Sequence, residues 1–504
     1  MNRPIERVTV VGGGSAGFLA ALSLRLTMPE LRVSVVRSAK IPVIGVGEST
    51  TTAVPRFLHD MLGLDRGEFF REVRPSWKLG IRFEWGDPRD SHFNYTFDPC
   101  MEVQLAPLGK LNAYHCLLDF RDGSHYGALM DRGLAPVIRR DDGMVLVDEG
   151  AGYHIENKAF VAYLEEKVRQ SGVPIVSGDV VDVKLAEDGS VASLLCEDGR
   201  QLDGDLFVDC TGFRSLLLGQ TLEEPWLSYD DALFADAAVV GSWSRSTDEP
   251  LLPYTTAETM DHGWCWRIEF PQHITRGYVF SSAFCSTEQA MSEMKAKNPR
   301  LGNDLRLIRF PTGRRNRFWV KNVAAVGNSA GFVEPLEATA LHLMIEQIRL
   351  LRLGLADGDR QINSALQRIL NQRYAELWDD TRNFLAVHYK FNRRLETPFW
   401  QHCRQATALH EAESLVELYR AAGPSTMCDA LIPPKTIFGF NGYMSMLIGQ
   451  RVPTDYRFQP SVEETRRWES YRHRIRQQVQ RSLPMQVAWE LVADPSFVWT
   501  RRGM

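Results

Sequence analysis

The segment that most constrains the fold of this chain lies near its start, where "RVTVVGGGSAGFLAALSLRL" is followed by "LRVSVVRS". A short β run, a glycine turn and an alanine- and leucine-rich helix lead into a second β run, which is the pattern of a βαβ unit. Gly12, Gly14 and Gly17 fit the spacing G-x-G-x-x-G. Glycines at this spacing allow a tight turn and bring a helix N-terminus close to a pyrophosphate. We therefore predict an α/β domain that binds a dinucleotide.

The second β run ends at Arg37, in "SVVRSAK", where many such domains carry an acidic residue that holds a ribose. An arginine at this position can bind the 2′-phosphate of NADP. It can also lie over the adenine of another dinucleotide. The residue alone leaves both interpretations open.

Two later segments show strands that end in turns of small residues. "DLFVDCTG" is the first, and "NVAAVGNSAGFVEPLEATALHLM" runs from a strand through a glycine turn into a helix, with Pro335 suited to its first turn. We expect both segments to return to the dinucleotide domain. Short β runs with two "EDG" turns precede them, and from about residue 371 we predict mostly helix. A chain of 504 residues is expected to form two or three structural units.

Charge and cysteine usage exclude several classes of protein. The net charge of −5 gives no basic excess, so we expect neither a nucleic-acid nor a membrane partner. The eight cysteines form no Cys-x-x-Cys pair and no cluster with histidine at zinc spacing, which predicts a reduced, cytoplasmic protein without a metal site. No apolar run is long enough for a signal peptide or a bilayer span. We expect a soluble protein.

The stretch "PSWKLGIRFEWG" alternates apolar and polar residues as a half-buried strand does. Lys78 falls on the polar face, together with Arg82 and Glu84. That face points either to water or into an enclosed channel. In water the lysine would keep its ordinary pKa, whereas burial would push it towards the neutral, nucleophilic amine.

Taken together, these segments resemble the flavin-dependent tryptophan halogenases, a branch of the flavin monooxygenase superfamily. The resemblance covers nearly the whole chain and rests on an ordered set of motifs: "VVGGGSAGFLAA", "IPVIGVGEST", "WKLGIRF", "DLFVDCTGFRSLL", "GWCWRI", "GYVFSSAF", "FVEPLEAT", "WDDTRNFLAVHY" and "TPFW". It implies an FAD-binding Rossmann-like domain of the glutathione reductase type, a β-rich substrate cap and a C-terminal helical subdomain. The corresponding residues are 1–85, 155–215 and 305–370 for the FAD domain, 86–154 and 216–304 for the cap, and 371–504 for the helical part.

The reaction of the family has two parts. Reduced flavin, supplied by a separate NAD(P)H flavin reductase, reacts with oxygen to give a hydroperoxide, and bound chloride or bromide attacks it to give hypohalous acid. The acid then travels through a tunnel to an aromatic substrate. Lys78 matches the lysine that holds hypohalous acid or forms a haloamine. Glu337, in "EPLEAT", matches the carboxylate that orients the oxidant or takes the proton from the ring.

The same resemblance predicts the binding residues. Tyr95 and Phe97 are expected to flank the substrate ring, and the backbone of Thr339 and Ala340 is expected to bind halide. Arg37 then flanks FAD rather than NADP. A homodimer is one possible assembly. The residues expected to bind FAD are Gly12, Gly14, Ser15, Ala16, Gly17, Arg37, Gly47, Glu48, Ser49, Gly327, Asn328 and Leu336.

Three departures from the family leave the function open. Glu269 follows Trp264, Trp266 and Ile268 where the family motif W-x-W-x-I-P ends in proline, and Ala340 replaces a glycine. The stretch "STMCDALIPPKTIFGFNGYM" lacks the tyrosine pair and aromatic segment that grip free tryptophan. We therefore predict a halogenase of an indole- or phenol-type compound, free or carried by a peptide. The alternative is a flavin monooxygenase that hydroxylates the ring, and a third reading is a flavin-binding protein without turnover or an NADP-dependent dehydrogenase.

Overall fold

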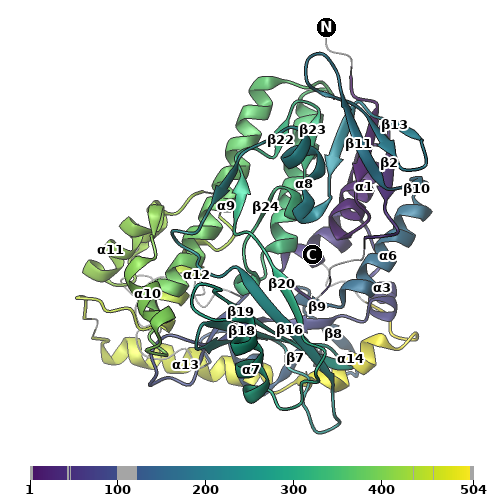
Figure 1. Cartoon of the computed structure of the whole chain (residues 1–504). Coiled ribbons are helices and arrows are strands. Elements are labelled where there is room, and N and C mark those ends of the chain that lie inside the picture. Colours follow the sequence, from purple (N-terminus) through teal and green to yellow (C-terminus); the bar gives the residue numbers. More distant parts are fainter. Residues whose placement is uncertain are drawn as a thin grey trace.

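The computed structural model describes residues 4–41, 45, 47–98, 122–434, 436–457 and 459–499. Two sheets dominate these residues. One lies in the upper part of Figure 1 among α1, α6 and α8, and the other lies in the lower part beside α7. The long helix α9 (Ser364–Phe391) reaches from the upper part towards the lower one.

The upper sheet has six strands in the order β10-β2-β1-β14-β23-β22, and all neighbours are parallel except β22 and β23. Strand β1 is buried from Val8 to Val11, as strands in the middle of a covered parallel sheet are. The predicted βαβ unit is confirmed, with α1 between β1 and β2. The bounds are β1 (Arg7–Val11), α1 (Ser15–Thr27), β2 (Arg32–Arg37), β10 (Ile175–Ser177), β14 (Leu206–Asp209), β22 (Trp319–Val320) and β23 (Val323–Ala325).

Helices pack against this sheet, and a separate three-stranded sheet follows β10 in the chain. Helix α1 packs against α6 (Asn157–Gln170) and α8 (Ala340–Asp357). The two predicted "EDG" turns are confirmed as the turns of a three-stranded meander. Its strands are β11 (Val180–Leu185), β12 (Val191–Cys196) and β13 (Gln201–Asp203).

The lower sheet has seven strands in the order β20-β16-β19-β18-β17-β5-β6. Its neighbours are antiparallel except β17 and β5, which are parallel. Helix α7 (Thr287–Lys297) packs against it. The strand bounds are β5 (Gly80–Glu84), β6 (Phe93–Thr96), β16 (Ala237–Ser244), β17 (Thr255–Met260), β18 (Gly263–Glu269), β19 (His273–Phe280) and β20 (Arg306–Arg309).

The predicted strand around Lys78 is two strands in different sheets. Strand β4 (Ser76–Lys78) pairs with β9 (Gly152–Ile155), which also pairs with β3 (Glu48–Ser49), whereas β5 belongs to the seven-stranded sheet. Leu79 links the two strands, and its amide donates to the carbonyl of Pro253. Because the chain changes sheets here, the regular alternation does not give Lys78 a solvent-facing side.

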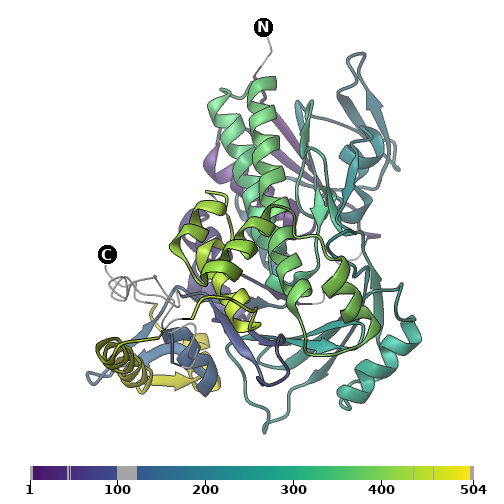
Figure 2. The same ribbon diagram turned by 90° about the vertical axis from the view of Figure 1, so that its left-hand side faces the viewer.

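The helical C-terminal region is confirmed, and its last part lies beside an earlier segment of the chain (Figure 2). Strand β25 (Ser482–Pro484) pairs with β7 (Leu134–Arg139), which pairs with β8 (Val145–Val147). Helix α13 (Val462–Val479) packs against α5 (His125–Arg132). The other helices of this region after α9 are α10 (Pro398–Ala406), α11 (Glu413–Ala422), α12 (Gly439–Gly449) and α14 (Met485–Ala493). The exact domain boundaries stay a prediction.

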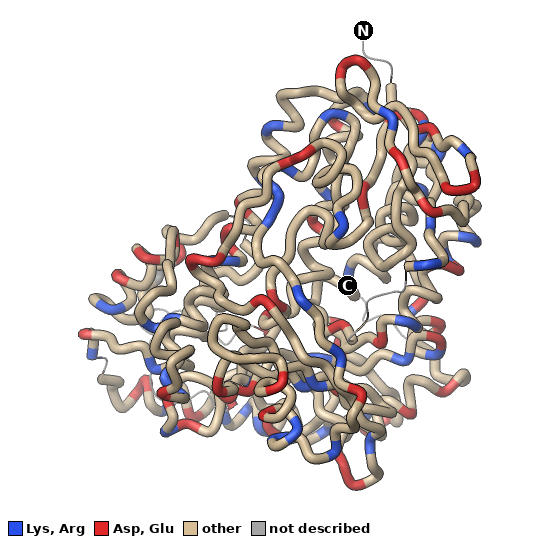
Figure 3. The backbone as a smooth tube through the Cα atoms, viewed as in Figure 1, with Lys and Arg blue, Asp and Glu red and all other residues tan. Residues whose placement is uncertain are grey.

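Acidic and basic residues intermingle over the whole described chain (Figure 3). Among the described residues, no helix is both long and apolar enough to cross a membrane. The same residues contain no cluster of three or more histidine, cysteine or acidic side chains placed to hold a metal ion.

Candidate active site

The glycine turn after β1 has the geometry of an anion-binding loop. Gly12 has a φ of +128°, and a side chain there would clash with the carbonyl oxygen of Cys210. A side chain at Gly17 would clash with the carbonyl oxygen of Gly12. At Gly14, by contrast, a Cβ would meet no atom within 4 Å, and no side chain caps the helix that starts after it. The open space beside Gly14, at the start of α1, fits a pyrophosphate.

Arg37 lies across this turn. A Cβ on Gly13 would come within 2.8 Å of the Arg37 Cδ, and the guanidinium forms an ion pair with Glu165 of α6. A 2′-phosphate would have to compete with that carboxylate. The arrangement favours a dinucleotide without this phosphate, such as FAD, over NADP.

The other residues expected at the cofactor come from segments far apart in the sequence. Asn157 donates from Nδ2 to Glu48 Oε1 (3.1 Å) and accepts from Ser15 Oγ (3.4 Å), so it connects two of them. Burial raises the pKa of Glu48 to about 7. The Oγ of Ser49 lies 2.8 Å from Thr255 Oγ1.

The turn after β23 approaches the first glycine turn. Gly327 has a φ of +74°, and a Cβ there would lie 3.1 Å from the Cβ of Ala16. Asn328 follows within the same short 3-10 helix, and Leu336 is buried in the next one. Gly47 packs on Phe270, where a Cβ would come within 2.7 Å of the ring. Since the parallel strands β1 and β23 end at the same edge of the sheet, the two glycine turns lie side by side there.

Lys78 is completely buried, and its amine has no hydrogen-bond acceptor in the described part of the chain. The Nζ lies 5.1 Å from the centre of the Phe97 ring. Burial lowers the pKa of Lys78 to about 7, while the charge of Glu337 acts in the opposite direction. The interpretation of Lys78 as a water-facing residue is therefore wrong. Its catalytic role stays a prediction.

Glu337 is 3% exposed and ends the 3-10 helix Pro335–Glu337. Its Oε1 lies 2.7 Å from Nε2 of His388, on α9. Burial raises the pKa of Glu337, whereas the hydrogen bond to His388 and the charge of Lys78 lower it. The two predicted catalytic residues are thus electrostatically coupled in one buried space.

The backbone expected to bind halide forms the start of α8. Ala338 has a left-handed φ of +57°, which costs a residue other than glycine about 1 kcal/mol. Thr339, only 1% exposed, is the N-cap, and no side chain caps the helix. An 18-residue helix with an uncapped N-terminus suits an anion. Halide binding by Thr339 and the half-buried Ala340 stays a prediction.

Tyr95 lies in β6, and Phe97 follows the last residue of that strand, with its amide donating to the carbonyl of Leu79. Phe97 faces the amine of Lys78, as described above. The Tyr95 ring lies 6.1 Å from Phe384, which stacks on Phe438 at 3.9 Å. A Cβ on Gly442 would come within 2.8 Å of the Tyr95 hydroxyl. The Phe97 ring thus lies beside the Lys78 amine, and a role of Tyr95 and Phe97 in flanking a flat aromatic substrate stays a prediction.

Comparison with known proteins decides the family. The tryptophan halogenase family model matches residues 7–465. The chain belongs to the tryptophan halogenase family. The tryptophan 6-halogenase ThaL of Streptomyces albogriseolus is 30% identical over 446 residues, which cover 84% of this chain and 83% of that protein. The predicted family and the predicted enzyme class, a flavin-dependent halogenase, are confirmed, and the family implies FAD and a halide.

Two solved structures show the same fold over the whole chain. MibH, described as a "lathipeptide tryptophan 5-halogenase", is 38% identical, with a TM-score of 0.86 and coverage of 98% of this chain and 94% of that chain. BrvH, a flavin-dependent halogenase from Brevundimonas sp. BAL3, is 28% identical, with a TM-score of 0.84 and coverage of 97% and 99%. The predicted fold class is confirmed.

Glu269, which replaces the family proline, has a structural partner. It is 1% exposed, it forms an ion pair with Arg245, and its Oε1 lies 2.6 Å from Arg267 Nε. Its backbone carbonyl accepts from Ser76, two residues before Lys78. The carboxylate is therefore held by two arginines.

The sequence did not predict which side chains form hydrogen bonds with Glu334 and Glu337. Glu334 accepts hydrogen bonds from Trp264 (3.2 Å) and from Tyr389, and burial raises its pKa to about 7. Tyr389 and His388 both lie in the motif "WDDTRNFLAVHY", and Trp264 lies in "GWCWRI". These motifs support the resemblance to the family, but their spacing in the sequence does not show that their side chains contact Glu334 and Glu337.

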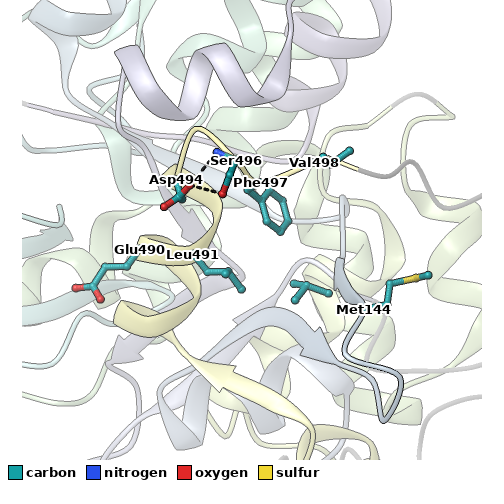
Figure 4. Close-up of a pocket in the computed structure, with 8 residues that line it drawn as sticks. Met144, Glu490, Leu491, Asp494, Ser496, Phe497 and Val498 are labelled. Carbon is teal, nitrogen blue, oxygen red and sulfur yellow. Dashed lines mark hydrogen bonds between the residues drawn. The ribbon is translucent and has the colours of Figure 1, made fainter.

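Two surface cavities lie away from these residues. One, of about 410 Å³, lies between the β8 turn and α14 and is lined by Met144, Leu491 and Phe497, among others (Figure 4). The other, of about 380 Å³, lies between α8 and α9, with charged side chains such as Glu346 and Arg373 around apolar ones. Neither cavity is lined by Lys78 or Glu337.

Proposed function

We propose that this enzyme uses reduced FAD to halogenate an aromatic ring of the indole or phenol type, and that a ring carried by a peptide is a better substrate than free tryptophan. The observation that carries the proposal is the buried amine of Lys78, which has no acceptor in the described structure and is coupled to Glu337. A buried lysine without a partner is costly to the fold, and such costs concentrate at functional sites.

A bound reduced flavin, together with oxygen, would supply the oxidising power that converts halide to hypohalous acid. The glycine turn holds the pyrophosphate, and the start of α8 holds the halide. The Lys78 amine then positions the acid by hydrogen bond or takes up its halogen. Where the amine positions the acid, a carbon–halogen bond forms on the ring as the halogen–oxygen bond breaks, and Glu337 takes the ring proton and passes it to the departing hydroxide, which leaves as water. Where the amine takes up the halogen, water leaves at that stage, and Glu337 returns the ring proton to the nitrogen as the nitrogen–halogen bond breaks.

The substrate proposal rests on two features. Gly442 packs close to Tyr95, within the segment that lacks an aromatic grip for free tryptophan. The similar structure MibH is described as acting on a lathipeptide. Together they favour a substrate that does not depend on a clamp for a free amino acid.

Ring hydroxylation is the alternative, and it loses one of its two supports. Glu269 is held by Arg245 and Arg267, so its presence does not by itself open the flavin side of the site. The second support, the alanine at position 338, still favours that alternative.

A substrate panel tests the proposal. The protein is incubated with FAD, NADH, oxygen, bromide, a separate flavin reductase, and either tryptophan, indole, phenol or tryptophan-containing peptides. We expect masses with the bromine isotope pattern for indole, phenol or peptide, little product from tryptophan, and none without the reductase. Efficient, regioselective bromination of free tryptophan would contradict the substrate assignment, and hydroxylated product without halide would contradict the reaction.

A further inference from the structure

His388 uses both of its ring nitrogens. It is fully buried near the end of α9, where its Nδ1 lies 2.8 Å from the carbonyl oxygen of Phe384 and its Nε2 lies 2.7 Å from Glu337 Oε1. The indole of Trp85 donates to the backbone carbonyl of His388 (3.0 Å). The imidazole is thus fixed in its position and orientation.

The partners of the two nitrogens determine where protons lie. A carbonyl oxygen only accepts hydrogen bonds, so Nδ1 of His388 must carry a proton. A neutral imidazole would then have no proton on Nε2, and its lone pair would face a carboxylate oxygen 2.7 Å away. That contact is attractive only if a proton lies between Nε2 and Oε1.

Charged side chains around the pair are few. On the strand side, Lys78 is the cation that acts on Glu337, and its amine also acts on His154 of β9. The rings of Phe83 (5.3 Å) and Phe384 (4.9 Å) pack against His388. Glu334, in the same loop as Glu337, already accepts from Trp264 and Tyr389. In the described structure, therefore, His388 is the side chain that forms a hydrogen bond with Glu337.

We infer that His388 is a positioning residue that is protonated on both nitrogens and holds Glu337 as a carboxylate, ready to accept the proton of the halogenated ring. This inference rests on the proposed function for its catalytic consequence, but not for the protonation state. Without the imidazolium, a carboxyl group in this dry space would stay protonated and could not act as a base. The imidazolium and the carboxylate also balance each other's charge, so the pair adds no net charge next to Lys78.

Nitrogen NMR tests the protonation state without any turnover. In protein labelled with ¹⁵N-histidine, we expect both nitrogens of His388 to show protonated shifts near pH 7. In Glu337→Gln, the amide can donate to Nε2, so this nitrogen should move to the shift of an unprotonated one. The signals of His388 are assigned by their loss in His388→Gln.

His59 is an internal control for this measurement. Its Nδ1 also lies 2.8 Å from a backbone carbonyl, that of Leu64, but its Nε2 faces the hydroxyl of Tyr153 rather than a carboxylate. Burial lowers the pKa of His59 to about 4, so it should remain neutral with an unprotonated Nε2. An unprotonated Nε2 on His388 in the wild type, like that of His59, would overturn the inference.

The pH dependence of turnover tests the consequence. Loss of the donor raises the pKa of Glu337, so the acid limb of the kcat profile should move to higher pH in His388→Phe. It should move less in His388→Gln, whose amide still donates. We expect kcat at neutral pH to fall about 100-fold in His388→Phe and about 10-fold in His388→Gln, with KM nearly unchanged.

A purely structural role gives a different result. If the variants bind FAD and melt like the wild type, and the acid limb does not move, His388 does not set the state of Glu337. If His388→Phe does not fold, the pH profile of His388→Gln and the NMR experiment still test whether His388 sets the protonation state of Glu337. A wild type that forms no halogenated product contradicts the proposed function, whereas the NMR result stands independently.

Discussion

At the scale of single residues, the environment of Lys78 shows why an alternating sequence does not settle exposure. The alternation of "SWKLGIRF" is real, but β4 and β5 lie in different sheets, and all three residues of β4 are buried. A lysine in such a place loses hydration that no acceptor in the described structure restores. Its neutral form is favoured, as a group that handles an electrophilic halogen requires.

The cost of burying Lys78 predicts how stability depends on pH. The pKa is about 7 in the folded protein and about 10.4 in the unfolded chain, so the unfolded state binds more protons between these values. The contribution of Lys78 to stability therefore rises as pH rises from 7 towards 10. We expect Lys78→Met to raise the melting temperature by about 2 °C or more at pH 7, and by less at pH 9.

The matched control for this measurement is Lys158→Met, which replaces an exposed lysine on α6. It should leave the melting temperature unchanged at both pH values. An equal gain in the two variants, or no gain from Lys78→Met, would show that the amine of Lys78 is hydrated in the folded protein.

At the scale of elements, the turn between β1 and α1 allows a clean test of cofactor binding. A methyl group at Gly14 would touch no protein atom within 4 Å, so Gly14→Ala should fold and melt like the wild type. If the pyrophosphate occupies that space, the methyl group should weaken FAD binding at least about 10-fold. Quenching of flavin fluorescence measures the affinity.

Gly302→Ala is the control for Gly14→Ala, because a Cβ at this exposed glycine also meets nothing within 4 Å. It should bind FAD as the wild type does. Unchanged affinity in Gly14→Ala as well would place the pyrophosphate elsewhere.

The end of β18 carries a second prediction at this scale. Removing one partner of a buried ion pair leaves the other charge without compensation, which costs about 3–5 kcal/mol. Glu269→Gln should therefore lower the free energy of unfolding by about 3 kcal/mol, since Arg245 has a side chain only 6% exposed. Glu187→Gln, at an exposed turn, should change nothing. A stable Glu269→Gln protein would show that the arginines do not need this carboxylate.

The elements differ in how far the sequence predicts them. The βαβ unit and the helices are local patterns, and the strand–turn–helix around "NSAGFVEPLEAT" indicated the return to the sheet. Contacts between distant residues were not predictable in this way. Glu337 and His388 are 51 residues apart, and Arg245 lies 24 residues before Glu269. Such pairs follow from how the sheets pack, which no spacing in the sequence encodes.

At the scale of the whole molecule, the proposed site draws on both large sheets. The six-stranded sheet carries the glycine turns. Phe97 follows β6 of the seven-stranded sheet. Lys78 ends β4, which belongs to the small sheet with β3 and β9. Helix α8 begins next to the segment that carries Glu337, and α9 brings His388. That an oxidant passes Lys78 on its way from the flavin to the aromatic substrate stays a prediction.

The most direct test of this account compares Lys78→Ala with the wild type in one assay. Both proteins are loaded with FAD and supplied with a reductase, NADH, bromide, labelled ¹⁸O₂ and the best substrate of the panel, while product masses and flavin reoxidation are followed. We predict brominated product from the wild type only, with similar FAD affinity and reoxidation in the two proteins. Full bromination by folded, flavin-loaded Lys78→Ala, or ¹⁸O-labelled hydroxylated product from the wild type without bromide, would contradict the account.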